Sequence, residues 1–400
     1  MRGLGENPFH TLLLLTEKPG EWAPWKVVPI PLALAAVSGL VWAWAVGEAG
    51  WGWAVGLGLL LFAAADWGLL ALLPRLGVSF GAAQLPFMAL TVLRWVIAML
   101  AAALAVWWPL PALVALALVQ LLVWGVAAYG TLVEPFRVKV THLDVPSAKL
   151  SNPGSHLRVV QISDLHVERL TRRERDLPAL VAKLAPDLIV LTGDFLSTSY
   201  NDDPQALADL RTLLEQFHAP VGIYAVWGTI EVDLLHLLRP IFDELGIVVL
   251  EEGVARVPTV KASAETEKGR DHGLWLVGLS CTRDLDAAGA RLRALLADLP
   301  SEGFSLLLYH TPDLMPQAAA MGVDLYLAGH THGGQWRLPG FGAILTSSQY
   351  WKRYEAGLYH EGDSMLYVSR GLGMEGFGTP RARIFCPPEV VVISVCGEGA

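Results

Sequence analysis

The strongest constraint on this chain is a stretch from Val27 to Thr131 that is almost free of charge. Its 105 residues hold only four charged side chains, namely Glu48, Asp66, Arg75 and Arg94. Turn signals divide the stretch into four apolar runs of about 20 residues, the length needed to cross a hydrocarbon core of ~30 Å. The runs cover residues 27–47, 51–73, 85–107 and 110–131. We therefore predict four transmembrane helices.

Basic residues in the short flanks indicate how these helices are oriented. The flanks expected inside hold Arg2, Lys18 and Lys26 before the first run, Arg75 between the second and third, and Arg137 and Lys139 after the fourth. The other two loops have no Lys or Arg. Because Lys and Arg favour the cytoplasmic side, we expect residues 1–26 to be a cytoplasmic segment. The C-terminal half would then also be cytoplasmic, in a multi-pass protein of the cell membrane.

Two opposite charges lie inside the predicted spans. Asp66 in the second span and Arg94 in the third reach similar depths from the same face. We interpret them mainly as a buried ion pair that fixes the packing of two helices. A path for lipid or substrate is the alternative.

The pattern changes from His156 onward to short β-branched runs that alternate with amphipathic segments. Strands are expected at 157–163, 187–192, 221–227, 247–250, 274–279, 305–309, 324–327, 366–369 and 390–395. Helices are expected at 175–184, 204–217, 232–245, 287–299 and 313–321. This alternation is typical of a layered α/β domain. We assign it to residues 156–396, with 132–155 as the connector and 27–131 as the membrane part.

Charge and cysteine content exclude some classes of protein. The formal net charge of −9 argues against a protein that binds nucleic acid by neutralising phosphates. Cys281, Cys386 and Cys396 are an odd number without paired metal-ligand spacing. We expect reduced core cysteines, and neither a disulfide framework nor a cysteine zinc site.

Carboxylates and imidazoles follow the predicted strands at their carboxyl ends. They are Asp164, His166, Asp194, His310, His330 and His332. Side chains in such positions meet at one edge of an α/β sheet. Two carboxylates and four imidazoles suit Mn²⁺, Fe, Zn²⁺ or Co²⁺, and a carboxylate can bridge two ions. The pattern predicts a metal site.

Residues 156–396 resemble the calcineurin-like metallophosphoesterases. The resemblance rests on Gly329-His330-Thr331-His332-Gly333-Gly334-Gln335, on Ser369-Arg370-Gly371-Leu372-Gly373 and on Pro387-Pro388-Glu389. The chain is also similar to the branch with multi-spanning N-terminal regions. The implied architecture is a four-helix transmembrane bundle followed by a layered α/β/β/α domain, with its site at the sheet edge.

The resemblance also implies roles for individual residues. Asp164, His166 and His332 would hold one metal, His310 and His330 would hold a second, and Asp194 would bridge the two. Asp194 and His330 would also serve in catalysis. The implied cofactors are one or two divalent ions, Mn²⁺, Fe²⁺ or Zn²⁺. The implied substrate is a phosphorylated small molecule or lipid, with the membrane as partner and no nucleic acid.

One motif departs from the family pattern. Where the family has Gly-Asn-His followed by an acid, this chain has Gly228-Thr229-Ile230-Glu231. Thr229 replaces an amide ligand of the second metal, and Ile230 replaces a histidine that acts on the leaving group. General acid catalysis typically contributes about 10²–10⁴ in rate, so we expect reduced turnover. Compensation by Glu231, Asp233 or His236 is the less favoured interpretation.

Three residues in or just after the family motifs, Arg370, Trp336 and Leu338, each have two interpretations. Arg370 is a candidate phosphate contact, because a guanidinium grips two oxygens, and a structural salt bridge is the alternative. Trp336 and Leu338 could line an apolar pocket, although core packing is favoured.

Two functions from different classes therefore remain. The first is a membrane-tethered, metal-dependent hydrolase of a phosphodiester, phosphomonoester or phosphoanhydride, with a lipid-linked substrate as one option. The second is a pseudoenzyme, in which the altered motif leaves a metal-binding or ligand-binding membrane module.

Overall fold

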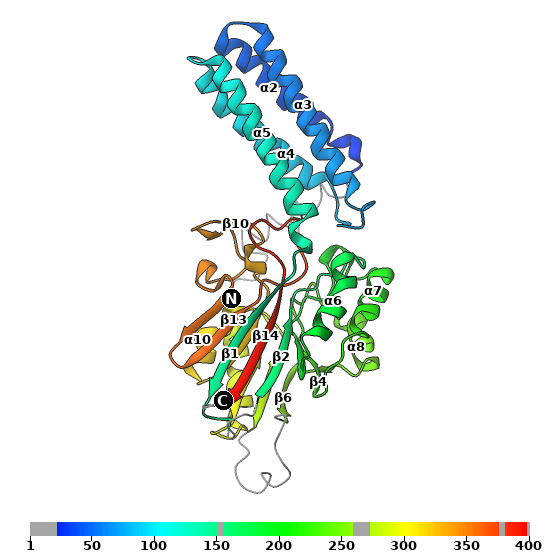
Figure 1. The fold of residues 1–400 in the computed structure, drawn as a ribbon, viewed down its shortest axis with the longest axis vertical. Coiled ribbons are helices and arrows are strands. Elements are labelled where there is room, and N and C mark those ends of the chain that lie inside the picture. Colours follow the sequence, from blue (N-terminus) through cyan, green and yellow to red (C-terminus); the bar gives the residue numbers. More distant parts are fainter. Residues whose placement is uncertain (1–21, 151–155, 259–272, 376–380, 398–400) are drawn as a thin grey trace. The chain divides into compact units, whose positions relative to one another are not determined.

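The computed structural model describes residues 22–150, 156–258, 273–375 and 381–397. The chain divides into two compact units. The first comprises residues 1–133 and 376–382, and the second comprises residues 134–375 and 383–400. Each unit is described by itself (Figure 1).

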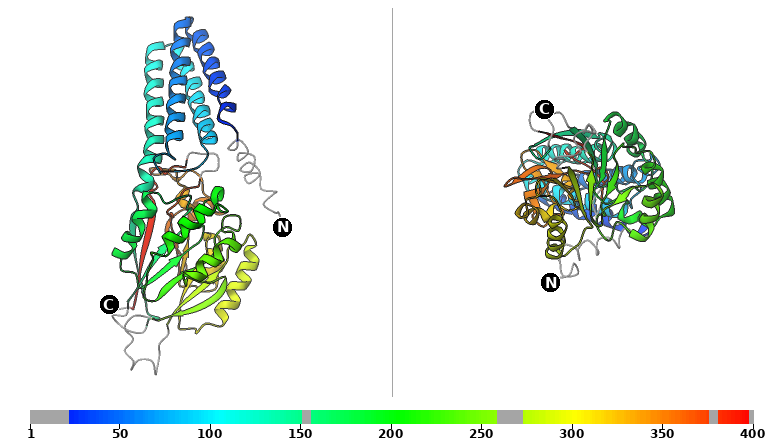
Figure 2. Two further views of the ribbon diagram at one scale, coloured as in Figure 1. Left: turned by 90° about the vertical axis from the view of Figure 1, so that its right-hand side faces the viewer. Right: turned by 90° about the horizontal axis from the view of Figure 1, so that it is seen from below.

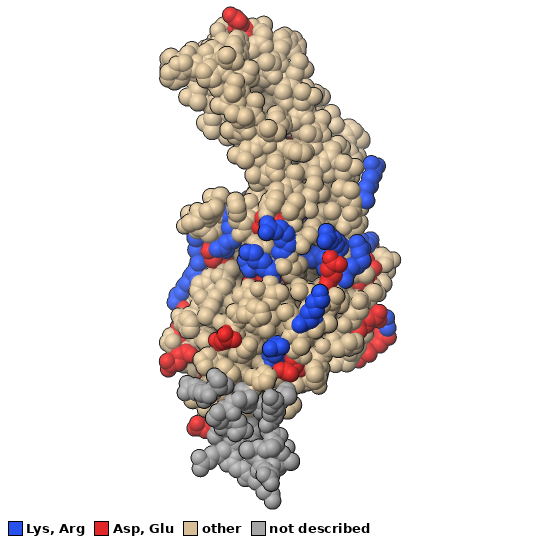
Figure 3. Space-filling view, viewed as in Figure 1, with Lys and Arg blue, Asp and Glu red and all other residues tan. Residues whose placement is uncertain are grey.

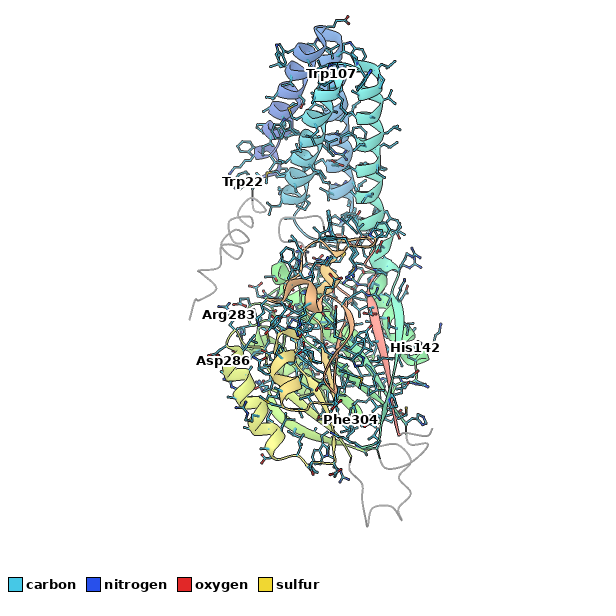
Figure 4. The ribbon with its side chains drawn as sticks, turned by 90° about the vertical axis from the view of Figure 1, so that its left-hand side faces the viewer. Trp22, Trp107, His142, Arg283, Asp286 and Phe304 are labelled. Carbon is cyan, nitrogen blue, oxygen red and sulfur yellow. The ribbon has the colours of Figure 1, made fainter. Side chains whose placement is uncertain are left out.

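Four long helices make up the first unit, and all four are long and apolar enough to cross a membrane. They are α2 (Pro29–Val46), α3 (Ala49–Leu72), α4 (Gln84–Ala105) and α5 (Pro109–Leu132), preceded by the short η3 (Pro24–Lys26). Proline starts α2 and α5, where its missing N–H costs no helical hydrogen bond. Trp22 and Trp107 lie toward opposite ends of the unit, as Figure 4 shows. Indole side chains favour the two membrane–water interfaces, so this placement fits four spans.

The two charges inside the spans form a buried ion pair, as expected. Arg94 Nε and Nη2 donate to the Asp66 carboxylate at 2.6 and 2.8 Å. Arg94 Nη1 also donates to the backbone oxygen and Oε1 of Gln120 at 2.9 and 2.8 Å. The network joins α3, α4 and α5, and it satisfies the guanidinium on all sides. It therefore supports the packing interpretation over a substrate path.

Two six-stranded sheets form the centre of the second unit. The first has the order β1-β14-β2-β3-β4-β5, with bounds Lys139–Ser147, Glu389–Gly397, His156–Ile162, Leu188–Leu191, Gly222–Ala225 and Val248–Val249. The second has the order β12-β13-β9-β8-β7-β6, with bounds Gly357–Glu361, Ser364–Val368, Leu325–Ala328, Phe304–Leu308, Leu274–Leu279 and Glu252–Val257. A small hairpin, β10 (Arg337–Leu338) and β11 (Gly342–Ala343), stands apart from both.

Helices cover the outer faces of both sheets. They are α6 (Arg172–Lys183), α7 (Pro204–Leu214), α8 (Leu235–Glu244), α9 (Leu285–Ala297) and α10 (Met315–Ala320). Helices α6–α8 pack on the first sheet, through side chains such as Leu177, Leu213 and Phe242. Helices α9 and α10 pack on the second sheet, and Figures 1 and 2 show the two sets on opposite sides of the strands. A third cluster of apolar side chains, including Val159 and Leu306, fills the space between the sheets. The α/β/β/α layering is as predicted.

Some strands were not predicted from the sequence. β1 lies within residues 132–155, which the sequence indicated as a connector, and it pairs in parallel with β14. Its burial pattern is mostly exposed or intermediate, because it is an edge strand, so it lacks the apolar run of a buried strand. β6 and β12 are also edge strands, and they were missed for the same reason. Cys386 is buried, whereas Cys281 and Cys396 are only half-buried, and all three are free thiols.

The parallel strands of both sheets end at the same edge. β2, β3 and β4 run parallel in the first sheet, as do β7, β8, β9 and β13 in the second. Gln161 at the end of β2 donates to the backbone oxygen of Ala328 at the end of β9, at 3.0 Å. This bond ties the two edges together. The loops that carry the predicted metal ligands therefore converge.

Candidate metal centre

The first group of candidate ligands consists of Asp164, His166 and His332. Asp164 and His166 follow β2, and His332 follows β9. Nε2 of His166 and Nε2 of His332 lie 3.0 Å apart, and Nε2 of His332 lies 3.6 Å from Oδ1 of Asp164. All three side chains are buried. One nitrogen from each imidazole and one carboxylate oxygen thus face a common point.

The second group consists of Asp194, His310 and His330. Nε2 of His310 lies 3.1 Å from Oδ2 of Asp194, and the rings of His310 and His330 are 5.0 Å apart between centroids. Nδ1 of His310 faces the backbone oxygen of Thr192 at 2.7 Å, which aims Nε2 at the group. Oδ2 of Asp194 is also 3.7 Å from Nε2 of His166. Asp194 therefore stands between the two groups, where a bridging carboxylate is expected.

The backbone at these positions is held in a rarely adopted conformation. Five of the six candidate ligands have positive φ angles, with 50° at Asp164, 42° at His166, 56° at Asp194, 70° at His330 and 50° at His332. Non-glycine residues adopt such angles at a cost, and they do so mainly at functional sites. Backbone bonds hold them, including Asp164 N to Gly193 O at 3.0 Å and His166 N to Asp194 O at 3.1 Å.

Glycines allow the loops to approach closely. A Cβ at Gly228 would meet Oδ1 of Asp194 at 2.2 Å, and one at Gly329 would meet Oδ2 of Asp164 at 2.3 Å. A side chain at either position would displace a candidate ligand. This packing requirement explains Gly at the start of the altered motif and Gly at the start of the Gly329–Gln335 motif.

The electrostatics of the cluster favour neutral imidazoles at two positions. Burial, together with the charge of His310, lowers the pKa of His330 to about 4. Burial, His166 and the Arg383 guanidinium hold the pKa of His332 well below its usual range. Neutral imidazoles offer a lone pair to a metal. Burial also lowers the pKa of His310, but the Asp194 carboxylate outweighs it and raises the net pKa to about 10.

A divalent ion fits these residues. Among the described residues, the buried atoms without a hydrogen-bond partner include Oδ2 of Asp164 in the first group. Leaving such atoms unpaired away from water is costly unless a ligand satisfies them. Imidazole nitrogens and carboxylate oxygens suit the metals predicted from the sequence. The structure brings all six candidate ligands together, and their roles as ligands remain our proposal.

The altered motif places Thr229 at the bridging carboxylate. Thr229 N donates to Oδ1 of Asp194 at 2.7 Å, and its hydroxyl lies 3.3 Å from Oδ2. A threonine hydroxyl is shorter than an amide side chain, so it reaches the carboxylate rather than further into the second group. Thr229 is the nearest candidate for the missing oxygen donor.

The three neighbours considered as substitutes for the missing histidine do not take its place. Asp233 is buried beneath the site, where its carboxylate accepts the backbone N–H groups of Asp194, Phe195 and Gly228 at 3.0, 2.9 and 2.6 Å. Burial and the Asp194 charge raise its pKa to about 7. Glu231 forms an ion pair with Arg283. His236 is exposed on α8, and Ile230 itself is 58% exposed.

Two residues near the centre were missed in the sequence. Oε1 of Glu375 lies 2.7 Å from Nδ1 of His166, on the side of the ring opposite the metal group. Arg383 is fully buried and donates to the backbone oxygens of Arg370, Gly371 and Gly373. Glu375 thus orients a candidate ligand, and Arg383 holds the loop behind it. Neither residue stands in a strand-end motif, so no sequence signal pointed to it.

The structure answers the open interpretations of Arg370 and Leu338. Arg370 Nη2 donates to Oε1 of buried Glu389 at 2.7 Å, which is the structural salt bridge. Phosphate binding by Arg370 stays a prediction, because no interaction among the described residues supports it. Core packing is wrong for Leu338, which is 50% exposed because it lies on the isolated β10–β11 hairpin.

Comparison with known proteins agrees with this geometry. The model of the calcineurin-like phosphoesterase family matches residues 157–334. Phosphodiesterase YaeI of Escherichia coli is 31% identical over 245 residues, which cover 60% of this chain and 82% of YaeI. The chain belongs to the calcineurin-like phosphoesterase family. It is therefore classed with the metallophosphoesterases, hydrolases that act on phosphoester bonds, and the predicted family and class are confirmed.

Other relatives extend the family resemblance. The uncharacterized metallophosphoesterase YkuE of Bacillus subtilis is 28% identical over 290 residues, covering 70% of this chain and 93% of YkuE. The UDP-2,3-diacylglucosamine pyrophosphatase LpxG of Chlamydia muridarum is 26% identical over 303 residues, covering 65% of this chain and 90% of LpxG. Both relatives are covered over most of their length.

Proposed function

We propose that this calcineurin-like phosphoesterase is a membrane-tethered, metal-dependent hydrolase of a phosphoanhydride bond in a lipid-linked substrate. The observation that carries the proposal is the combination of six candidate ligands, five buried and His330 half-buried, with an exposed Ile230 that follows Thr229. The ligands provide for phosphoryl chemistry, and Ile230 leaves the leaving group without a proton donor. Each part is argued in turn.

The metals would be held by the two groups already described, with Asp164, His166 and His332 in one and His310 and His330 in the other. Asp194 would contact both. When bound, such ions neutralise charge on the phosphoryl oxygens and lower the pKa of water toward neutrality. Asp233 fixes the loop that carries Asp194, through three backbone N–H groups. The protein thereby positions the bridging carboxylate before substrate arrives.

The missing histidine restricts the substrate by the acidity of its leaving group. An alkoxide departs poorly without a proton donor, and Ile230 has no proton to give. A phosphate leaving group is different, since its second pKa is about 6 and it departs as a stable anion. A phosphoanhydride therefore needs the absent acid least. Of the three substrate classes that the sequence leaves open, we favour this one.

The relatives and the membrane spans support a lipid-linked form of this substrate. LpxG is named as a pyrophosphatase of a diacylated nucleotide sugar, which is both a phosphoanhydride and a lipid. This chain also has four candidate membrane spans. A tethered enzyme meets substrates held in the same bilayer.

The proposal predicts a steep dependence of rate on leaving-group acidity. With Mn²⁺, the full chain in detergent micelles should hydrolyse methyl p-nitrophenyl phosphate at least about 10²-fold faster than methyl phenyl phosphate, because phenolate is far more basic. A nucleoside diphosphate lipid should also be cleaved at its anhydride bond. Nitrophenolate absorbance measures the first rate, and chromatography of the released phenol and nucleoside monophosphate measures the other two. Equal rates for both aryl esters would show that another residue supplies the acid.

We also propose that the catalytic unit faces the cytoplasm. Support comes from Lys26, Arg75, Arg137 and Lys139, which all flank the spans on one side by sequence. A reporter fused after Ala400 should be active only if it is of the type that works in the cytoplasm. Activity from a reporter that works only outside the cytoplasm would reverse the orientation.

A pseudoenzyme remains the second candidate, and the altered motif is the observation in its favour. Thr229 lies against Asp194 instead of offering an amide, and the Ile230 side chain has no proton to donate. This candidate predicts metal binding without hydrolysis of either aryl ester or of the anhydride. The leaving-group experiment therefore separates the two functions.

A further inference from the structure

The second unit carries an exposed apolar hairpin outside its two six-stranded sheets. Residues 337–353 contain β10 and β11, and we call this segment the apolar hairpin. Its exposed large apolar side chains are Leu338, Phe341, Ile344, Leu345 and Trp351, exposed by 50, 55, 40, 58 and 54%. Phe385, exposed by 62%, lies beside it. These six are among ten exposed large apolar side chains described in this unit.

Several contacts hold the hairpin and Phe385 together. Arg337 N donates to Ile384 O at 2.9 Å, and Ile384 N donates to Gln335 O at 2.8 Å. Leu338, Phe341 and Phe385 line one open groove of about 430 Å³, with Arg337 and Glu355. Clusters of exposed apolar side chains such as this one mark surfaces that bind a protein, a ligand or a membrane.

The hairpin carries three cations, which are ion-paired with carboxylates just outside it, Arg337 and Lys352 with Glu355 and Arg353 with Glu361. Residues 337–353 include Arg337, Lys352 and Arg353 and no Asp or Glu. Nζ of Lys352 lies 3.5 Å from the ring centroid of Phe341, so the ammonium lies over the aromatic face as a cation–π pair. β10 lies at the end of the unit where Lys and Arg gather on the face drawn in Figure 3. Basic and aromatic side chains together are typical of segments that enter a membrane interface.

The chain itself ties this surface to a membrane span. α5 ends at Leu132, and Glu134 follows two residues later as the first residue of the second unit. The Glu134 carboxylate accepts the backbone N–H of Cys386, which directly follows Phe385. Two residues of chain reach only about 7 Å, so Glu134 cannot lie far from the end of α5. Phe385 therefore lies next to a segment that begins two residues after the last candidate span ends.

We propose that the apolar hairpin and Phe385 insert into the interface of the bilayer that holds the four spans. The candidate metal centre adjoins this surface, since Arg337 Nη1 donates to Gly333 O at 3.0 Å and Gly333 follows the candidate ligand His332. Insertion would hold the centre at the depth of the lipid head groups. The proposal depends on the membrane spans and stands whether or not the chain cleaves a phosphoanhydride.

Photocrosslinking to lipid tests the insertion directly. The full chain is placed in nanodiscs of phosphatidylcholine and phosphatidylglycerol that contain a phospholipid with a diazirine on its acyl chain. After irradiation, mass spectrometry maps the lipid adducts. Adducts are expected on α2–α5 and also on peptides of residues 337–353. Peptides that carry the exposed apolar Leu235 and Leu358 should have none, and they serve as internal controls. Adducts confined to α2–α5 would overturn the proposal.

A variant with added charges on the hairpin distinguishes loss of membrane insertion from loss of folding. Phe341→Glu with Leu345→Glu should lower the hairpin adducts about tenfold, because carboxylates resist entry into the interface. Adducts on α2–α5 and the thermal unfolding midpoint should not change. Leu358→Glu is the matched control and should leave all adducts unchanged. Unchanged hairpin adducts in the double variant, or hairpin-to-hairpin crosslinks between two chains in place of lipid adducts, would contradict insertion.

Discussion

Replacing Asp194 by Asn should lower metal-dependent hydrolysis by about 10³-fold or more, an effect at least as large as removing one preorganised catalytic donor. Oδ2 of Asp194 lies 3.1 Å from Nε2 of His310 in the second group and 3.7 Å from Nε2 of His166 in the first. An amide keeps the shape of the side chain but loses the charge that attracts both ions. We expect the variant to retain less metal than the parent after dialysis. Elemental analysis and the p-nitrophenyl assay measure the two effects.

Asp176→Asn is the matched control for this change. Asp176 is an exposed carboxylate on α6 whose described ion pair is with Arg172, one turn away. Its replacement should leave both metal content and rate unchanged. If Asp194→Asn kept full activity, Asp194 would not be the bridging ligand, and the proposed centre would be wrong.

Restoring the family motif with Thr229→Asn and Ile230→His should raise hydrolysis of methyl phenyl phosphate by about 10²-fold or more. The amide would complete the second metal group, and the imidazole would act on the leaving group that this metal positions. The two changes depend on each other, so their combined gain should exceed that of either alone. The p-nitrophenyl ester needs an acid less, so its gain should be smaller.

Leu235→His provides the control for the added histidine. Leu235 is an exposed apolar residue at the start of α8, five positions after Ile230. A histidine there should not change the leaving-group dependence. If the restored motif left both rates unchanged while Asp194→Asn still removed activity, the altered motif would not limit catalysis.

The sequence predicted well those candidate ligands that directly follow the parallel strands. Parallel strands end at one edge, so polar residues after β2, β3, β8 and β9 had to meet, and they do. The positions of Glu375 and Arg383 could not be predicted this way. Both lie in irregular segments between the Ser369–Gly373 and Pro387–Glu389 motifs, and their contacts with His166 and His332 come from tertiary structure rather than from a local pattern.

The fold could be predicted from the sequence where a buried helix or strand has a recognisable run of apolar residues. The four spans and the buried strands have long or dense apolar runs, whereas β1, with its half-exposed edge, does not. For Leu338 the prediction was wrong in the opposite direction, since a residue expected to be buried is exposed. An apolar residue after a motif suggests the core, but the hairpin that carries it packs on neither sheet, so it is exposed. Local sequence could not distinguish a core residue from one that we assign to a membrane interface.

Metal titration of the full chain tests the central claim most directly. Chelator treatment should abolish hydrolysis of methyl p-nitrophenyl phosphate, and added Mn²⁺ should restore it. Elemental analysis should find one ion that survives dialysis and a second that binds weakly, because Thr229 offers a short hydroxyl where an amide would reach further. Activity should rise as the second ion binds. Full activity in the chelated chain, or a chain that holds two ions and cleaves neither the ester nor a phosphoanhydride, would contradict the account.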